Sequence, residues 1–230
     1  RMKGTKLFIT GTDTGVGKTV VATALLEAAR KHGLEAIGIK PVAAGCERGQ
    51  RGLMNADALE LLAASSADLD YRQVNPVALE PAIAPHIAAQ QAGIALDAGT
   101  LANHCREMEA ADWTIIEGAG GWLVPLNDSE TMADLCVTLN ATAILVVGIR
   151  LGCINHALLS LAAIESSGVK LAGWFGNCLE PEMPALQENL ATLRNRIDMP
   201  CLGTIPHLNP CNAKTAAQYI DMQMLLDATQ

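Results

Sequence analysis

The chain reads Gly11-Thr12-Asp13-Thr14-Gly15-Val16-Gly17-Lys18-Thr19 between an apolar run and a segment with helical periodicity. Glycines in such a turn let the backbone fold around a polyphosphate, so that amides of the loop and of the following helix face the anion. The spacing before Gly-Lys-Thr is one residue longer than usual, which marks a lengthened Walker loop. The motif predicts a nucleotide site in which Lys18 faces the β- and γ-phosphates and the Thr19 hydroxyl binds Mg²⁺. A glycine-rich turn with a solvated lysine is the alternative.

The fold class follows from the pattern on either side of this loop. Apolar runs rich in β-branched residues alternate with longer segments of helical periodicity. This alternation is typical of βαβ units, so we expect an α/β protein with a doubly wound, mainly parallel sheet flanked by helices, the P-loop NTPase fold. We expect a single domain over residues 1–230. The expected strands cover residues 6–10, 36–40, 113–117, 143–149, 171–176 and 201–205, and the expected helices cover 18–31, 56–64, 97–110, 132–139, 155–166, 184–196 and 215–226.

One segment fits neither the helical periodicity nor the pattern of the expected strands. Residues 75–93 contain three prolines and are expected to form a long excursion between sheet elements. Most glycine-rich or charged clusters elsewhere fall just after an expected strand, where ligands gather at the carboxyl edge of an open α/β sheet.

Composition excludes several classes of protein. Of 230 residues, 50% are hydrophobic and 17% are charged, which suits a folded protein with a sizeable core. The formal net charge is −8 and no block of Lys or Arg occurs, so we expect no nucleic-acid partner. The longest apolar stretch, 143–149, is far shorter than a membrane span, so we expect no membrane association. The N-terminal residues lead straight into a strand and the seven cysteines form no Cys-x-x-Cys, which predicts a cytoplasmic protein without disulfide or zinc.

Two carboxylates are placed to hold a metal. Glu117 ends an expected strand and opens the glycine-rich run 118–121, and Asp57 lies near an expected helix start. Mg²⁺ prefers few protein oxygens together with phosphates and waters, so Thr19, Asp57 and Glu117 would suffice. Alternatively, Glu117 is a solvated loop acid, and Asp57 is favourable at a helix start without any function.

Two further features share this sheet edge. Lys40 ends an expected strand before Pro41, and its alternative is a solvated strand-end lysine. Residues 148–156 join a buried strand to a helix, and the amides at that helix start could accept a carboxylate. Asn155 or His156 could equally be a simple N-terminal cap.

In their joint order these segments resemble the dethiobiotin synthetase family, ATP-dependent enzymes of biotin synthesis. The matching segments are Gly11–Thr14, Val16–Thr19, Lys40–Ala43, Asp57–Leu59, Glu117–Trp122, Leu151–Ala157, Gly173-Trp174 with Asn177, and Gly203 with Ile205-Pro206. The resemblance implies a homodimeric ligase that converts 7,8-diaminononanoate, CO₂ and ATP with Mg²⁺ to dethiobiotin, ADP and phosphate. It implies a carbamate and a carbamic–phosphoric anhydride as intermediates.

The resemblance also implies residue roles. It places Lys18 and Lys40 at the reacting carbamate as catalytic residues, and Thr19, Asp57 and Glu117 on the metal. Nucleotide binding falls to Gly15, Val16, Gly17, Lys18, Thr19, Val20, Asp57, Glu117, Gly118, Ala119, Gly120, Asn177, Cys178, Pro206, His207 and Leu208. Substrate binding falls to Thr14, Lys40, Ala44, Gly152, Cys153 and Asn155, of which the last three, at a helix start, come from the partner subunit of the dimer.

Some positions depart from the pattern of the best-known members of that family. Gly15 replaces an acidic loop residue, Ala44 a serine near the substrate, and Arg150 a lysine. Asn189 stands where a tyrosine helps bind the carboxylate tail, and Cys211 where a glutamate meets the nucleotide. These changes concern substrate affinity and base selectivity, and they leave the lysines and the expected metal ligands intact.

Other classes of nucleotide-binding protein remain as alternatives. A ParA/MinD-like switch ATPase carries an additional lysine near the start of its loop, and none occurs between Gly11 and Gly17. A GTPase would need Asn-Lys-x-Asp, and the nearest candidate reads Asn177-Cys178-Leu179-Glu180, which favours ATP over GTP. An amidoligase of corrin synthesis would need a glutamine-hydrolysing domain, for which 230 residues leave no room. An inactive paralogue that binds nucleotide also stays open.

Overall fold

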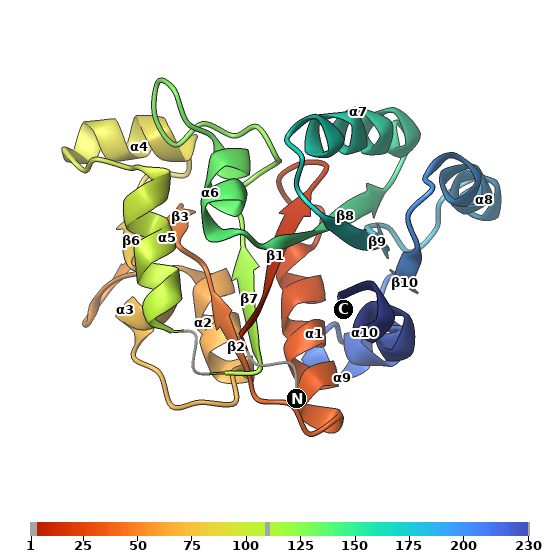
Figure 1. Cartoon of the computed structure of the whole chain (residues 1–230), viewed down its shortest axis with the longest axis horizontal. Helices are drawn as coiled ribbons and strands as arrows, with labels where there is room; N and C mark the ends of the chain where they lie inside the picture. Colours follow the sequence, from red (N-terminus) through yellow and green to blue (C-terminus); the bar gives the residue numbers. More distant parts are fainter. Residues whose placement is uncertain (1–3, 109–110, 230) are drawn as a thin grey trace.

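A six-stranded sheet forms the centre of the protein in the computed structural model, which describes residues 4–108 and 111–229 (Figure 1). All five strand pairings are parallel, and the order across the sheet is β10-β9-β8-β1-β7-β2. The bounds are Thr5–Gly11 for β1, Ala36–Ile39 for β2, Trp113–Glu117 for β7, Thr142–Ile149 for β8, Leu171–Cys178 for β9 and Cys201–Ile205 for β10. The expected doubly wound parallel sheet is confirmed: β7 and β10 have the expected bounds, and the other strands differ by one or two residues at an end.

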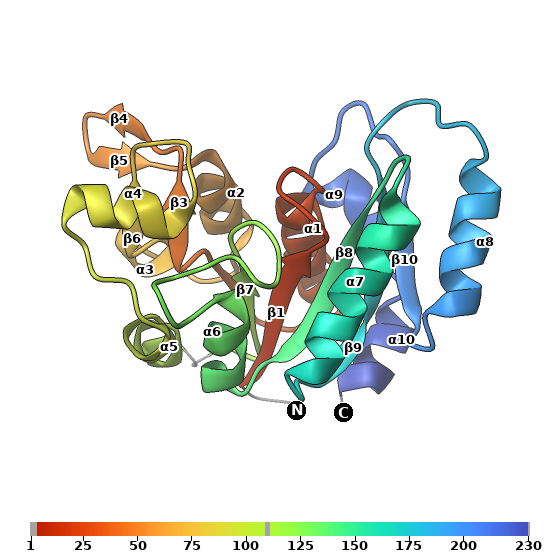
Figure 2. The same ribbon diagram turned by 90° about the horizontal axis from the view of Figure 1, so that it is seen from above.

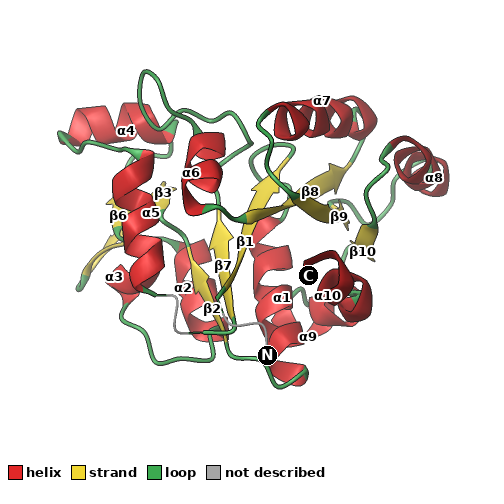
Figure 3. Ribbon diagram, in the orientation of Figure 1, coloured by secondary structure: helices red, strands yellow, loops and turns green. Residues whose placement is uncertain are grey.

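Helices cover both faces of the sheet (Figures 1 and 3). Alternate residues of a strand point to opposite faces, so Leu7 and Ile9 belong to one apolar core and Phe8 to the other. The first core contains α1 (Lys18–Lys31), α2 (Ala56–Ala64), α9 (Ala213–Ala216) and α10 (Met222–Thr229). The second contains α5 (Ala98–Glu107), α6 (Met132–Leu139), α7 (Cys153–Ser166) and α8 (Leu186–Arg196). Within residues 4–108 and 111–229, no helix combines the length and the apolarity needed to cross a bilayer.

Several expected helices differ in their bounds. The helix expected over 215–226 is wrong: α9 and the 3₁₀ helix Ala217–Tyr219 end at Ile220, whose backbone is extended, and α10 starts afterwards. Asp221 causes the break, because its side chain accepts the Met224 amide at 2.9 Å and its own amide donates to the Leu202 carbonyl of β10 at 2.9 Å. Helices α7 and α8 each begin two residues away from the expected start, α7 earlier and α8 later. Residues 109–110 of the helix expected over 97–110 lie outside the described residues.

The excursion lies beside the β2 edge of the sheet, level with the carboxyl ends of the strands (Figures 1 and 2). It lies between two strands of the sheet as expected, but it is longer than 75–93 and contains short elements, of which the three-residue strands are too short to show a period. These short elements are β3 (Val42–Ala44), β4 (Glu47–Gly49), β5 (Gly52–Met54), α3 (Tyr71–Val74), β6 (Val77–Leu79) and α4 (Pro85–Ala92). Parallel pairing of β3 with β6 brings the segment after β6 toward the loops of the main sheet.

Candidate active site

A cavity of about 740 Å³ opens at the carboxyl edge of the sheet, between the loop after β1 and the excursion. Twelve residues predicted from the sequence line it, namely Thr14, Gly15, Gly17, Lys18, Thr19, Val20, Lys40, Ala44, Asp57, Glu117, Ala119 and Gly120. Six further residues complete the lining, namely Glu60, Ala82, Ile83, Ala84, Pro85 and Val124. The Walker loop of residues 11–19, from here on called the phosphate loop, therefore shares one cavity with both lysines and the expected metal ligands.

The loop between β1 and α1 depends on glycine at two positions. Gly15 and Gly17 have φ of 72° and 92°, a left-handed backbone that side-chain-bearing residues adopt only with strain. A Cβ at Gly17 would also lie 2.1 Å from Nδ2 of Asn177. The Asn177 side chain donates to the Val16 carbonyl at 3.0 Å, so the end of β9 holds the phosphate loop from behind. The predicted strand–loop–helix arrangement is present, and Lys18 is the first residue of α1.

Lys18 is buried in the cavity, with 6% of its surface exposed, which excludes the alternative of a solvated lysine. Its Nζ donates to the Asp13 carbonyl at 3.0 Å, and the Asp13 carboxylate pairs with Arg150 at 2.6 Å. Burial lowers the pKa of Lys18 to about 8; the Glu117 charge opposes this shift and the Lys40 charge adds to it. Because nearby negative charge compensates this buried ammonium only in part, Lys18 favours the binding of an anionic ligand.

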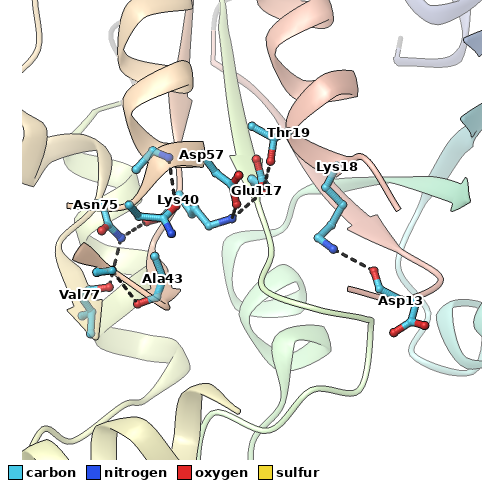
Figure 4. A network of polar contacts seen from close by, with 12 residues as sticks. Asp13, Lys18, Thr19, Lys40, Ala43, Asp57, Asn75, Val77 and Glu117 are labelled. Carbon is cyan, nitrogen blue, oxygen red and sulfur yellow. Dashed lines mark hydrogen bonds and ion pairs between the residues drawn. The ribbon is translucent and has the colours of Figure 1, made fainter. Parts of the chain in front are cut away.

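Lys40 lies between two carboxylates (Figure 4). Its Nζ is 2.6 Å from Oε1 of Glu117 and 2.8 Å from Oδ2 of Asp57, and the Thr19 hydroxyl donates to the same Glu117 Oε1 at 3.0 Å. Lys40 is 5% exposed and Glu117 is 1% exposed, so the solvated alternatives for both residues are wrong. Burial alone would lower the pKa of Lys40, but the Glu117 and Asp57 charges outweigh burial and raise it.

The oxygen atoms around Lys40 suit a magnesium ion. Oε2 of Glu117 is buried and lacks a hydrogen-bond partner among the described residues, although buried polar atoms nearly always have one. Asp57 lies in the first turn of α2, behind its N-cap Asn55, and burial, which raises the pKa of its carboxyl, is outweighed by Lys40, which lowers it. Two carboxylates and a hydroxyl are the hard oxygen donors that Mg²⁺ takes, alongside phosphates and water. The donor set of Thr19, Asp57 and Glu117 therefore fits Mg²⁺.

Several predicted residues lie outside the cavity lining. Cys178, the last residue of β9, is buried in one apolar core, and the side chain of Val16 is buried in the other. Gly118 follows β7, where a Cβ would lie 3.1 Å from the Phe8 ring. Pro206, His207 and Leu208 follow β10, which ends at the same edge of the sheet as β1. Asn177 contacts the loop backbone as described above.

The start of α7 also lies outside the lining of this cavity. Gly152 is its N-cap, with φ of 93° and no side-chain cap, so the alternative of Asn155 or His156 as a cap is wrong. Cys153 and Asn155 fall in the first helical turn, whose backbone amides have no intrahelical acceptor. The Cys153 thiol donates to Oδ1 of Asn189 on α8 at 4.0 Å, which places Asn189 beside this helix start.

Sequence reasoning missed one charged residue and one apolar wall of the cavity. Glu60 lies one helical turn after Asp57 on α2, a spacing that could have identified it; burial raises the pKa of its carboxyl, and Asp57 and Glu117 raise it further. The segment Ala82–Pro85 follows β6 and forms the apolar wall together with Val124. Its only sequence signal is the proline content of the excursion.

The fold and the site define a P-loop nucleotide-binding protein. The protein family described as "AAA domain" matches residues 5–215. Among solved structures, the chain resembles the MinD cell-division ATPase of Pyrococcus furiosus, with a TM-score of 0.61 and 14% identity over 98% of each chain. The MinD of Pyrococcus horikoshii gives a TM-score of 0.57 and 16% identity, covering 98% of this chain and 94% of that one. At such identities the likeness concerns the fold alone.

Sequence relatives narrow the class to one family. The chain is 56% identical to the ATP-dependent dethiobiotin synthetase BioD of Cellvibrio japonicus, covering 96% of this chain and 97% of that protein. Proteins of the same name from Pseudomonas paraeruginosa and Marinobacter nauticus are 52% and 49% identical, over 95% and 96% of this chain and 96% and 95% of theirs. The chain belongs to the ATP-dependent dethiobiotin synthetase family.

Proposed function

We propose that this protein is an ATP-dependent carbon–nitrogen ligase that converts 7,8-diaminononanoate, CO₂ and ATP to dethiobiotin, ADP and phosphate, with Mg²⁺ as cofactor. A single domain carries the whole reaction. The observation that carries the proposal is the placement of Lys40, Lys18 and the phosphate loop around one cavity. Membership of the family supports the same reaction.

The first step requires a neutral amine. An alkyl amine has a pKa of about 10, so removing its proton at pH 7 costs about three pKa units, or about 4 kcal/mol. Lys18 and Lys40 disfavour a third ammonium in the cavity and stabilise the carbamate anion that forms when the amine attacks CO₂. Thr14, which also lines the cavity, would contact the substrate there.

The next steps activate the carbamate and close the ring. A carbamate oxygen attacks the γ-phosphate in line, and ADP leaves as its bond to that phosphate breaks. The second amine then attacks the carbonyl carbon of the resulting carbamic–phosphoric anhydride, loses a proton and displaces phosphate as the ring closes. Lys18 and the loop amides stabilise the charge spread over the transferred phosphoryl group. Thr19, Asp57 and Glu117 would hold Mg²⁺, which would supply positive charge beside the phosphates of the nucleotide. Because both amines belong to one bound molecule, proximity accelerates ring closure.

The remaining parts of the ligands extend beyond this cavity. Asn177 and the segment 206–208 stand at the edge where adenine would lie. The start of α7 does not line the cavity of its own chain, and Leu151 beside it is 95% exposed. We therefore assign the carboxylate of the substrate to this helix start from the second subunit of a homodimer. The apolar wall formed by Ala82–Pro85 and Val124 suits the hydrocarbon chain.

Mass spectrometry tests the proposal. The purified protein is incubated with diaminononanoate, ¹³C-bicarbonate, Mg²⁺ and either ATP or GTP. The expected product is the cyclic urea, one ¹³C atom heavier, formed in equal amount to ADP. ATP cleavage without this product would contradict the proposal and favour a switch ATPase. Size-exclusion chromatography with light scattering of the same sample tests the homodimer.

A further inference from the structure

The ammonium of Lys40 occupies the space between the expected metal ligands. Its Nζ contacts Glu117 Oε1 at 2.6 Å and Asp57 Oδ2 at 2.8 Å, and no third protein carboxylate contacts it among the described residues (Figure 4). The Thr19 hydroxyl donates to the same Glu117 oxygen at 3.0 Å. Two of the three side chains assigned to Mg²⁺ thus contact the Lys40 ammonium, and the third, Thr19, contacts the Glu117 oxygen that the ammonium holds.

Charge explains why Lys40 lies there. Glu117 is almost fully buried, and a buried carboxylate without a cationic partner is strongly unfavourable. Lys18 does not fill this role, because its Nζ turns away to the Asp13 carbonyl (Figure 4). Lys40 therefore supplies the positive charge that the carboxylates need before a metal arrives.

An ammonium and a divalent cation bound between the same two carboxylates would lie only a few ångströms apart, and two cations at such a distance repel each other. The backbone of Lys40 is fixed, since its amide donates to the Val74 carbonyl at 2.8 Å and its carbonyl accepts from Asn75 Nδ2 at 2.7 Å. Only the side chain of Lys40 is free to move. The cavity that it lines offers the space for that movement.

We infer that Lys40 holds the metal ligands in the ligand-free protein and that metal binding displaces its ammonium into the cavity. Metal loading and delivery of Lys40 to the carbamate are then a single exchange of cations. The ammonium also lowers the affinity of the ligand-free protein for free Mg²⁺, so the metal binds chiefly together with the nucleotide, whose phosphates add ligands. This inference rests on the metal ligands assigned under the proposed function.

Metal affinity without nucleotide tests the exchange. Mn²⁺ replaces Mg²⁺ as the probe, and electron paramagnetic resonance measures free Mn²⁺ during titration of the unchanged protein, Lys40→Met and Lys18→Met. Lys40→Met is expected to bind Mn²⁺ at least about tenfold more tightly than the unchanged protein, because a cation in contact with the ligands is gone. Lys18→Met removes a charge from the same cavity without a ligand contact and is expected to change affinity by less than about threefold. Adding Asp57→Asn to Lys40→Met should abolish the gain.

Equal, weaker or absent Mn²⁺ binding by folded Lys40→Met would overturn the inference. If that variant does not fold, NMR of ¹³Cε-labelled lysine in the unchanged sequence decides. The Lys40 signal is expected to shift when Mg²⁺ joins a non-hydrolysable ATP analogue, and an unshifted signal would overturn the inference. Formation of the cyclic urea by a protein that fails this test would leave the proposed function standing. Absence of the urea despite a tenfold gain would contradict the proposed function alone.

Discussion

Replacing Lys18 with methionine is expected to stabilise the nucleotide-free protein while removing its activity. Burial lowers the pKa of Lys18 from 10.5 to about 8 in the folded protein. Each pKa unit corresponds to about 1.4 kcal/mol, so the charged side chain costs the folded state about 3 kcal/mol at pH 7. Methionine has a similar length and no charge, and it loses only the hydrogen bond to Asp13, worth about 1 kcal/mol. The expected gain in the free energy of unfolding is about 2 kcal/mol.

The pH dependence of this gain has a definite sign. A lysine whose pKa is lowered by folding releases its proton earlier in the folded state than in the unfolded state. The unfolded chain therefore binds more protons between about pH 8 and pH 10.5, and the stability of the unchanged protein rises over that interval. The burial penalty falls from about 3 kcal/mol at pH 7 to about 1.4 kcal/mol at pH 9.5, so the advantage of Lys18→Met shrinks by about 2 kcal/mol.

Urea denaturation at both pH values measures these quantities. Lys31→Met on the same helix is the matched control, because that lysine is half exposed and its ion pair with Glu27 is 3.9 Å long. The control is expected to change stability by less than about 0.5 kcal/mol at either pH. A destabilised Lys18→Met, or an advantage that does not shrink as the pH rises, would refute the argument from burial.

Further predictions concern the site and its loops. Lys40→Gln should lower turnover at least about 100-fold, while the dissociation constant of ATP measured by calorimetry without divalent metal stays within about threefold; near-normal turnover in steady-state kinetics would contradict the role of Lys40. Asp57→Asn should raise the Mg²⁺ concentration for half-maximal activity about tenfold or more, and an unchanged requirement would remove Asp57 from the metal. Asn177→Ala should cost about 1–3 kcal/mol in urea denaturation, because the Val16 carbonyl loses its donor; a neutral effect would show that the loop holds its shape without Asn177. Arg150→Gln should cost less than about 1 kcal/mol, and any loss should disappear in 1 M salt, because both partners are partly exposed; a salt-independent loss would indicate a contact other than the ion pair.

Local patterns in the sequence predicted the frame of the protein. The six strands and the helices α1, α2 and α6 follow from apolar runs and periodicity, because each element is long enough to show its pattern. The break at Ile220 was not predictable from periodicity. It depends on a hydrogen bond from the Asp221 amide to the Leu202 carbonyl in β10, which lies outside the segment whose periodicity predicted the helix. The strands β3 to β6 have three residues each and are stabilised by pairing rather than by a sequence period.

The sequence predicted those parts of the candidate site whose position follows from the parallel sheet. The phosphate loop is a contiguous motif, and the rule that parallel strands end at one edge brought Lys40 and Glu117 together across a separation of 77 residues. The rule gives an edge but no side-chain partners. The bridge from Lys40 to Asp57 and the turn of Lys18 toward Asp13 depend on rotamers and burial. The wall at Ala82–Pro85 depends on the excursion, whose path no local pattern sets.

Asn75 joins two elements beside the cavity, the end of β2 and the start of β6. Its side-chain amide donates to the Lys40 carbonyl at 2.7 Å and to the Val77 carbonyl at 3.1 Å (Figure 4). One side-chain amide thus fastens the residue that follows β2 to β6, the strand that leads to the apolar wall. A change in chain length between Asn75 and Val77 would therefore disturb the backbone at Lys40 and the start of β6 together.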